Sequence, residues 1–114
     1  MASNLRILLA EDNEVNQHLM LRIFARLGYE AELAQNGIQV LNKMDKADYD
    51  LIFMDIMMPK MDSVQATRLI RYHYSEEKQP KIYALTAETS IEGREKYLSA
   101  GMNGVFTKPI KVDE

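Results

Sequence analysis

Five polar side chains stand at the ends of short apolar runs, where they could act together. Three are carboxylates, one is a hydroxyl and one is an ammonium: Glu11, Asp12, Asp55, Thr86 and Lys108. Three neighbouring carboxylates repel one another unless protons or a cation neutralise them. A hard divalent cation with oxygen ligands would supply the missing charge, and Mg²⁺ in particular keeps coordination positions open for a substrate phosphate.

Phosphoryl transfer is the chemistry that suits this set. A carboxylate can attack phosphorus and form an acyl phosphate. The transferred group has three equatorial oxygens that need positive charge or hydrogen-bond donors, and a metal ion, the Lys108 ammonium and the Thr86 hydroxyl would each serve one of them. Asp55 follows the central run of the five and is the expected nucleophile, which leaves Glu11 and Asp12 as the metal-side carboxylates.

Each of these residues also has a purely structural reading. Polar residues are common where a strand ends, and a single aspartate there more often forms a turn or caps a helix. That reading is weaker for the whole set, because clustered negative charge needs a counter-charge whatever its origin.

The elements that must position these side chains alternate along the chain. Apolar runs of strand length cover Leu5–Ala10, Ala31–Ala34, Leu51–Met54, Ile82–Leu85 and Val105–Thr107. The first, third and fourth runs are almost continuously apolar, which is typical of strands that are covered on both faces.

Helical spacing separates the strands. The first predicted helix has an apolar stripe of Val15, Leu19, Ile23 and Leu27, which Met20 and Phe24 widen. Gly28 follows directly and should end this helix. The next two are marked by Ile38, Leu41 and Met44, and by Ala66, Leu69 and Ile70. A fourth helix begins after a Ser90 cap, carries Ile91, Tyr97 and Leu98, and ends at Gly101.

This alternation predicts a parallel sheet with helices on both faces, because crossovers between parallel strands are right-handed. Ligands of such sheets bind beyond the carboxyl ends of the strands. Each of the five candidate side chains follows a predicted strand, so we expect all five to meet at the carboxyl ends of the strands.

Composition sets the remaining limits. The 114 residues suffice for one domain, residues 1–114, and the net charge of −3 without a basic cluster predicts no binding to nucleic acid or to anionic membranes. There is no cysteine, no apolar run long enough to cross a bilayer, and no signal-peptide pattern at the start. We therefore expect a cytoplasmic location.

Four separated segments resemble the receiver domains of two-component response regulators, and most closely those attached to hybrid histidine kinases. They are Ile7-Leu8-Leu9-Ala10-Glu11-Asp12-Asn13, Phe53-Met54-Asp55-Ile56-Met57-Met58-Pro59, Ala84-Leu85-Thr86-Ala87 and Phe106-Thr107-Lys108-Pro109. The resemblance covers nearly the whole chain in order. It implies a flavodoxin-like, doubly wound sheet of five parallel strands in the order 2-1-3-4-5.

The resemblance also implies a role for each candidate. Asp55 is similar to the phosphoacceptor, which takes its phosphoryl group from a phosphohistidine of a histidine kinase or histidine phosphotransfer protein. Glu11 and Asp12 match the acidic pair that holds Mg²⁺, with Asp55 and the Met57 backbone carbonyl completing the protein ligands. Thr86 matches the hydroxyl that moves toward the phosphoryl group in the conformational switch. Lys108 matches the lysine that pairs with a phosphoryl oxygen, and its bond to Pro109 is commonly cis in this family.

Three features depart from the family pattern. Val105 stands where an aromatic residue is usual, and Phe106 cannot replace that residue because adjacent side chains of a strand face opposite ways. Ser63 stands at a common glycine position, so either that backbone conformation is altered or Ser63 caps the third helix. Residues 109–114 supply at most the first turn of a fifth helix, so we expect a missing segment, or a helix exchanged from a partner chain, and an apolar face left exposed.

Two other function classes remain as alternatives. A small phosphohydrolase with an aspartate nucleophile would usually carry a second acid two residues later, where this chain has Met57. A pure interaction module that never receives phosphate would not need the acidic pair, Thr86 and Lys108. For a receiver, the apolar Met57 offers an attacking water no hydrogen bond, which predicts a long-lived phosphoryl group.

Overall fold

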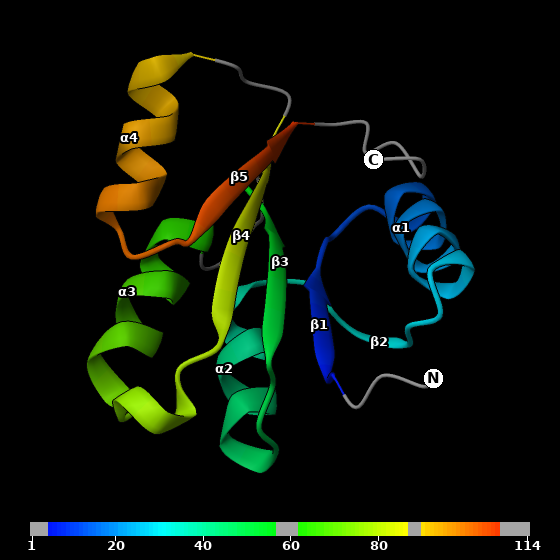
Figure 1. Ribbon diagram of the computed structural model, residues 1–114, viewed down its shortest axis with the longest axis horizontal. Helices are drawn as coiled ribbons and strands as arrows, with labels where there is room; N and C mark the ends of the chain where they lie inside the picture. Colours follow the sequence, from blue (N-terminus) through cyan, green and yellow to red (C-terminus); the bar gives the residue numbers. More distant parts are fainter. Residues whose placement is uncertain (1–4, 57–61, 87–89, 108–114) are drawn as a thin grey trace.

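The computed structural model describes residues 5–56, 62–86 and 90–107 and shows a five-stranded parallel sheet in the order β2-β1-β3-β4-β5 (Figure 1). The strands are β1 (Ile7–Ala10), β2 (Ala31–Ala34), β3 (Leu51–Asp55), β4 (Lys81–Thr86) and β5 (Gly104–Thr107). The predicted fold class and strand order are therefore confirmed. The three almost continuously apolar runs are the three interior strands, as their burial on both faces requires.

Helices cover both faces of this sheet. They are α1 (Glu14–Arg26), α2 (Gly37–Lys46), α3 (Ser63–His73) and α4 (Ile91–Ser99), and a short 3-10 turn, η1 (Glu76–Lys78), precedes β4. In the described part of the chain, α1 lies alone on one face while α2, α3 and α4 lie on the other (Figure 1). Residues 108–114, which bear the expected start of a fifth helix, lie outside the described residues.

Side-chain caps fix where each α-helix begins. The N-cap residue accepts a hydrogen bond from the backbone N–H three residues later in every case, through Asn13, Asn36, Asp62 and Ser90. The predicted Ser90 cap is confirmed, whereas the idea that Ser63 caps α3 is wrong, because Asp62 holds that position. Gly28 and Gly101 follow α1 and α4 with φ of 91° and 112°, as a C-terminal stop requires.

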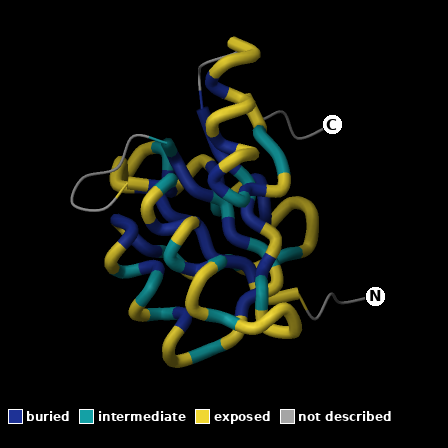
Figure 2. Tube along the Cα trace, turned by 90° about the vertical axis from the view of Figure 1, so that its left-hand side faces the viewer, coloured by how far each residue is buried: buried dark blue, intermediate teal, exposed yellow. Residues whose placement is uncertain are grey.

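The core consists of two layers, one on each side of the sheet. The larger layer joins the sheet to α2, α3 and α4 through side chains such as Val40, Ile70 and Tyr97, and the smaller one packs Met20, Ile23 and Phe24 of α1 on β1 and β4. Buried positions gather in the centre of the molecule and exposed positions lie mostly on the outside (Figure 2).

Two helices are turned differently from what their apolar residues suggested. On α1, Val15 is 74% exposed and Leu19 is 48% exposed, while the polar Gln17 is buried. On α4, Ile91 and Leu98 are exposed and only Tyr97 of the three predicted side chains is buried. The described α4 buries only Gly93 and Tyr97, so a narrow strip suffices to pack it.

Arg71 joins the end of α3 to the turn between α4 and β5. Its guanidinium donates to the carbonyls of Gly101 at 2.8 Å and Pro80 at 2.7 Å, and to the side-chain oxygens of Gln79 at 2.6 Å and Asn103 at 2.8 Å. A Cβ on Gly101 would lie 2.8 Å from Arg71 Cγ. The glycine is therefore needed for this contact as well as for its backbone angle.

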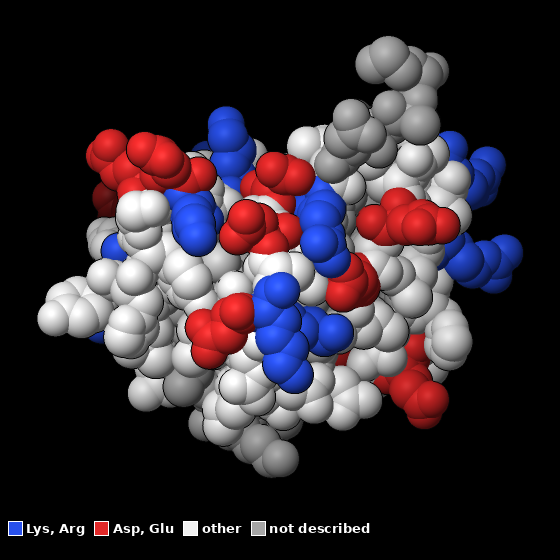
Figure 3. Space-filling view, turned by 90° about the horizontal axis from the view of Figure 1, so that it is seen from below, with Lys and Arg blue, Asp and Glu red and all other residues white. Residues whose placement is uncertain are grey.

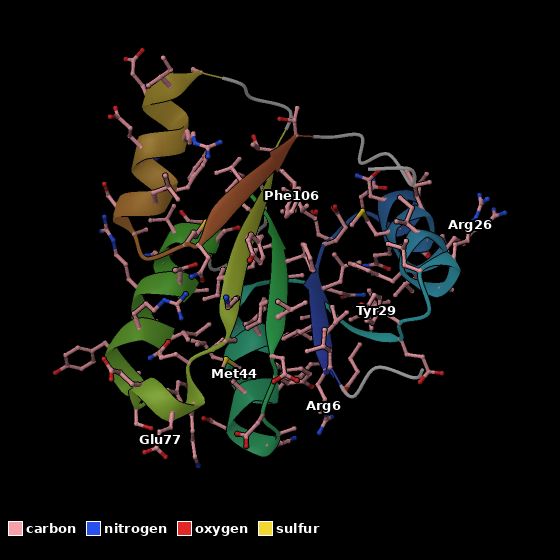
Figure 4. All side chains as sticks on the ribbon, in the orientation of Figure 1. Arg6, Arg26, Tyr29, Met44, Glu77 and Phe106 are labelled. Carbon is pink, nitrogen blue, oxygen red and sulfur yellow. The ribbon has the colours of Figure 1, made fainter. Side chains whose placement is uncertain are left out.

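A second polar network lies at the amino ends of the strands. Arg6 contacts Glu32 at 2.8 Å and lies over the Tyr49 ring, and the Tyr49 hydroxyl donates to the same carboxylate at 2.9 Å. The hydrogen bond from Arg6, followed by that from Tyr49, lowers the pKa of Glu32. Acidic and basic side chains alternate over this end of the molecule (Figure 3), and Arg6 lies below β1, far from Phe106 at the top of β5 (Figure 4).

None of the helices in residues 5–56, 62–86 and 90–107 has both the length and the apolar character that a membrane span needs.

The contact between Tyr74 and Asp45 predicts a loss of stability in alkali. The Tyr74 hydroxyl donates to Asp45 at 2.6 Å, and burial followed by this bond raises the pKa of Tyr74 to about 12. The unfolded tyrosine loses its proton near pH ~10, so the protonated folded form contributes stability below that pH and loses it as pH rises from 10 through 12. Urea unfolding should show wild type about 1 kcal/mol more stable than Tyr74→Phe at pH 8, with the difference shrinking toward pH 12. A difference independent of pH would contradict the assignment.

Thr67 predicts the opposite kind of mutational effect. Its side chain is fully buried on α3, and its hydroxyl has no hydrogen-bond partner among the described residues. Valine has the same shape without the buried polar group and a similar helix propensity. Thr67→Val should raise the free energy of unfolding by about 1 kcal/mol in urea titrations. A destabilised variant would mean that the hydroxyl is bonded after all.

Candidate functional site

The three predicted acids meet at the carboxyl end of the sheet. One carboxylate oxygen from each of Glu11, Asp12 and Asp55 lies within 4.8 Å of the other two. The cause is strand pairing, since Ala10 of β1 lies opposite Met54 of β3 and the acids follow directly. Glu11 and Asp55 are buried and Asp12 is exposed, so the cluster opens to solvent on one side.

Hydrogen bonds to the backbone and side chain hold Glu11 in place. Its N–H donates to the Ala34 carbonyl at 2.9 Å, and its own carbonyl accepts from Gln17 Nε2 at 2.6 Å. The Asn13 N–H donates to the Glu11 carboxylate at 3.3 Å. Gln17 was not among the predicted site residues, although a polar residue in the middle of a helix face that also carries Met20 and Phe24 was a usable signal.

Asp55 is held in a similar way at the end of β3. The Ile56 N–H donates to the Leu85 carbonyl at 3.1 Å, and the Asp55 carbonyl accepts a hydrogen bond from Ser63 Oγ. Ser63 is 1% exposed and stands at the first position of α3. This serine departs from the family pattern, but nothing in the sequence predicted its contact with Asp55.

Thr86 lies beside the acids at the carboxyl end of the sheet. Thr86 ends β4, one residue beyond Leu85, which pairs with Asp55, and it is 6% exposed. It also pairs with Thr107, which ends β5 immediately before Lys108. Lys108 and Met57, like Pro109, lie outside the described residues. The structure thus places Glu11, Asp12, Asp55 and Thr86 together at the carboxyl end of the sheet.

The donor set fits a hard divalent cation. The converging ligand atoms are carboxylate oxygens, which are the ligands that Mg²⁺ prefers, and two of the three acids are buried. Buried carboxylates are costly unless a positive charge compensates them. Exposure of Asp12 leaves one side open for water or a phosphate oxygen.

Val105 and Phe106 point to opposite faces of β5, as their adjacent positions predicted. Val105 packs against the core layer shared with α3 and α4. Phe106 is 42% exposed and lies 5.9 Å from Phe53 and 5.4 Å from Tyr83, between ring centroids, on the α1 face (Figure 4). Phe106 therefore does not occupy the place of the usual aromatic residue.

Comparison with known proteins identifies the same fold and family. The family model described as "Response regulator receiver domain" matches residues 7–114. The chain is 40% identical over 112 residues to hybrid signal transduction histidine kinase G of Dictyostelium discoideum and 39% identical over 109 residues to the sensor protein EvgS of Escherichia coli, with 96% of the chain covered in both. It spans 3% and 9% of those two proteins.

Solved structures give the same answer. The receiver domain of sensor histidine kinase PA1611 from Pseudomonas aeruginosa, which has a magnesium ion in its active-site cleft, matches with a TM-score of 0.85 and 39% identity over 97% of this chain and 90% of that one. The co-crystal structure of the Saccharomyces cerevisiae histidine phosphotransfer protein Ypd1 with the receiver domain of Ssk1 matches with a TM-score of 0.87 and 27% identity, over 99% and 84%. The fold, the acidic edge and these matches agree, and the chain belongs to the response regulator receiver domain family.

Proposed function

We propose that this chain works in a phosphorelay, where Asp55 accepts a phosphoryl group from a phosphohistidine of a histidine kinase or histidine phosphotransfer protein. The observation that carries the proposal is the acidic cluster, in which the buried Asp55 stands with Glu11 and Asp12 at the carboxyl end of the sheet. Two facts support the choice of donor. The relatives include hybrid histidine kinases, and one structural neighbour is a complex with a phosphotransfer protein.

The proposed reaction is a single displacement at phosphorus. An Asp55 carboxylate oxygen forms the new P–O bond while the P–N bond to the donor histidine breaks, and the electron pair stays on the imidazole nitrogen, which then takes up a proton. Glu11, Asp12, Asp55 and the Met57 carbonyl would hold Mg²⁺, which supplies positive charge to the phosphoryl oxygens when bound. Lys108 pairs with a second oxygen and Thr86 donates its hydroxyl to a third.

The conformational response would run through Thr86 and Lys108. Thr86 ends β4 beside the acids, so a small movement of its hydroxyl toward a new phosphoryl oxygen would shift the end of that strand. Among the described residues, neither Val105, which faces the core, nor Phe106, which faces the opposite side, takes the place of the aromatic residue in the family's switch. This domain catalyses its own phosphorylation and dephosphorylation and turns over no separate substrate.

The partner would dock on the exposed side of α1. Val15 and Leu19 are large apolar side chains that α1 leaves exposed, and they lie within two turns of the Asp12 carboxylate along the chain. An apolar patch next to a charged site is the kind of surface that a protein partner covers. We assign it to the histidine phosphotransfer protein or kinase domain. We also propose that this domain lies in the cytoplasm and that in its natural setting it is fused to a hybrid kinase.

Replacement of Asp55 tests the proposed function directly. Asp55→Asn removes the nucleophile with little change of shape, so incubation with a phosphorylated phosphotransfer protein and Mg²⁺ should leave no acid-labile label on the chain. Asp48→Asn, an exposed aspartate at the other end of the sheet, is the matched control and should label like wild type. Undiminished labelling of Asp55→Asn would refute the proposal.

Counting the phosphoryl groups that each chain takes up, together with a phosphate-release assay on phosphomonoesters, separates a receiver from a phosphohydrolase. A receiver takes up at most about one phosphoryl group per chain on a single acceptor side chain. Sustained release of phosphate from phosphomonoesters in the presence of Mg²⁺ would instead favour the enzyme.

Polar substitutions on α1 test the docking surface. Val15→Ser combined with Leu19→Ser should raise the donor concentration needed for half-maximal labelling by about tenfold, because the apolar surface that the partner would bury is lost. Leu27→Ser, which removes an exposed leucine at the far end of the same helix, is the control and should change it little. Equal effects of both replacements in labelling kinetics would place the contact elsewhere.

A further inference from the structure

Two buried side chains donate hydrogen bonds to the backbone of the two buried acids. Ser63 Oγ donates to the Asp55 carbonyl, and Gln17 Nε2 donates to the Glu11 carbonyl at 2.6 Å. We propose that Ser63 and Gln17 are positioning residues that fix where the Asp55 and Glu11 carboxylates point. The inference rests on the proposed function, because it assigns these residues to the phosphorylation of Asp55.

Ser63 forms one of two hydrogen bonds to the peptide group that joins Asp55 to Ile56. On the other side of that group, the Ile56 N–H donates to the Leu85 carbonyl of β4 at 3.1 Å. A peptide group is planar, so bonds at both of its ends fix its rotation about the Asp55 Cα–C bond. The side chain branches from the same Cα, so the direction of the Asp55 Cα–Cβ bond, from which the carboxylate extends, is set along with the backbone.

The helix that carries Ser63 is itself anchored. Asp62 caps α3 by accepting from the Gln65 N–H at 2.8 Å, and Ala66 and Ile70 pack into the core layer under the sheet. Ser63 is almost fully buried, where a hydroxyl is costly unless it is bonded. The bond to Asp55 thus connects a rigid helix to the last residue of β3.

Gln17 plays the matching part for Glu11. The Glu11 N–H is bonded to the Ala34 carbonyl at 2.9 Å and its carbonyl to Gln17, although β1 ends one residue earlier. Gln17 belongs to the buried face of α1, which Asn13 caps. Both acids therefore lie just at or beyond the end of their strands, where a helix supplies a side-chain donor to their carbonyls.

The two residues should affect different steps of the reaction. Asp55 is the proposed nucleophile, so a looser Asp55 backbone lowers the rate of attack, since small displacements of a reacting atom are costly. Glu11 is a proposed metal-side ligand, so a looser Glu11 backbone weakens Mg²⁺ binding. A general loss of stability would not slow attack in one variant and weaken Mg²⁺ binding in the other.

The test compares Ser63→Ala and Gln17→Leu with Thr67→Val, which removes another buried hydroxyl one turn further along α3. In the metal-free protein, the backbone carbonyl ¹³C shift of Asp55 should change in Ser63→Ala, and that of Glu11 in Gln17→Leu. Labelling with phosphoramidate should be about tenfold slower at saturating Mg²⁺ in Ser63→Ala. Gln17→Leu should need about tenfold more Mg²⁺ for the half-maximal rate. Thr67→Val should match wild type in all these measurements.

Unchanged carbonyl shifts and rates in folded variants would overturn the inference, and so would equal slowing by Thr67→Val. If Ser63→Ala does not fold, Ser63→Cys, with its weaker donor, takes its place. Failure of the proposed function looks different. Wild type would then take up no label, while the carbonyl shifts and a direct Mg²⁺ titration of the same variants would still decide whether Ser63 and Gln17 position the acids.

Discussion

The repulsion between Glu11 and Asp55 is the constraint on which the site depends. Pairing of β1 with β3 brings these two buried acids together, and Asp12 adds a third carboxylate within 4.8 Å. Such an arrangement is tolerable only where a cation is shared or protons are held. The fold therefore holds three carboxylates close together, and the exposed Asp12 leaves one side of the cluster open to solvent.

The fold around this constraint keeps chemistry and stability at opposite ends of the sheet. At the carboxyl ends of the strands lie the acids and Thr86, and the amino ends carry the Arg6–Glu32–Tyr49 network, whose charges are paired. Converging carboxylates at one end are thus accompanied by an ion pair and its hydrogen bonds at the other. The two core layers cover the faces of the sheet along its length, and the pairing of β1 with β3 sets the register that brings Asp55 beside Glu11.

Much of this arrangement could be read from sequence, because it depends on period and order. The apolar runs gave the interior strands, Gly28 and Gly101 gave two helix ends, and the residues after β1, β3 and β4 gave the acids and Thr86. Helix rotation could not be read, since Val15 and Leu19 continue an apolar stripe that the sheet leaves uncovered while it buries Gln17. The Ser63 and Gln17 contacts were also not predictable. They join side chains to backbone carbonyls, which every residue has, so the residue types do not show which carbonyl accepts the bond.

Arg71 has a consequence of its own for how this domain behaves in salt. All four acceptors of its guanidinium are neutral oxygens, two from the backbone and two from side-chain amides. Screening by dissolved ions weakens attraction between exposed opposite charges far more than it weakens such bonds. The connection between α3 and β5 should therefore stay equally firm in dilute and concentrated electrolyte, while the Arg6–Glu32 pair loosens as ionic strength rises.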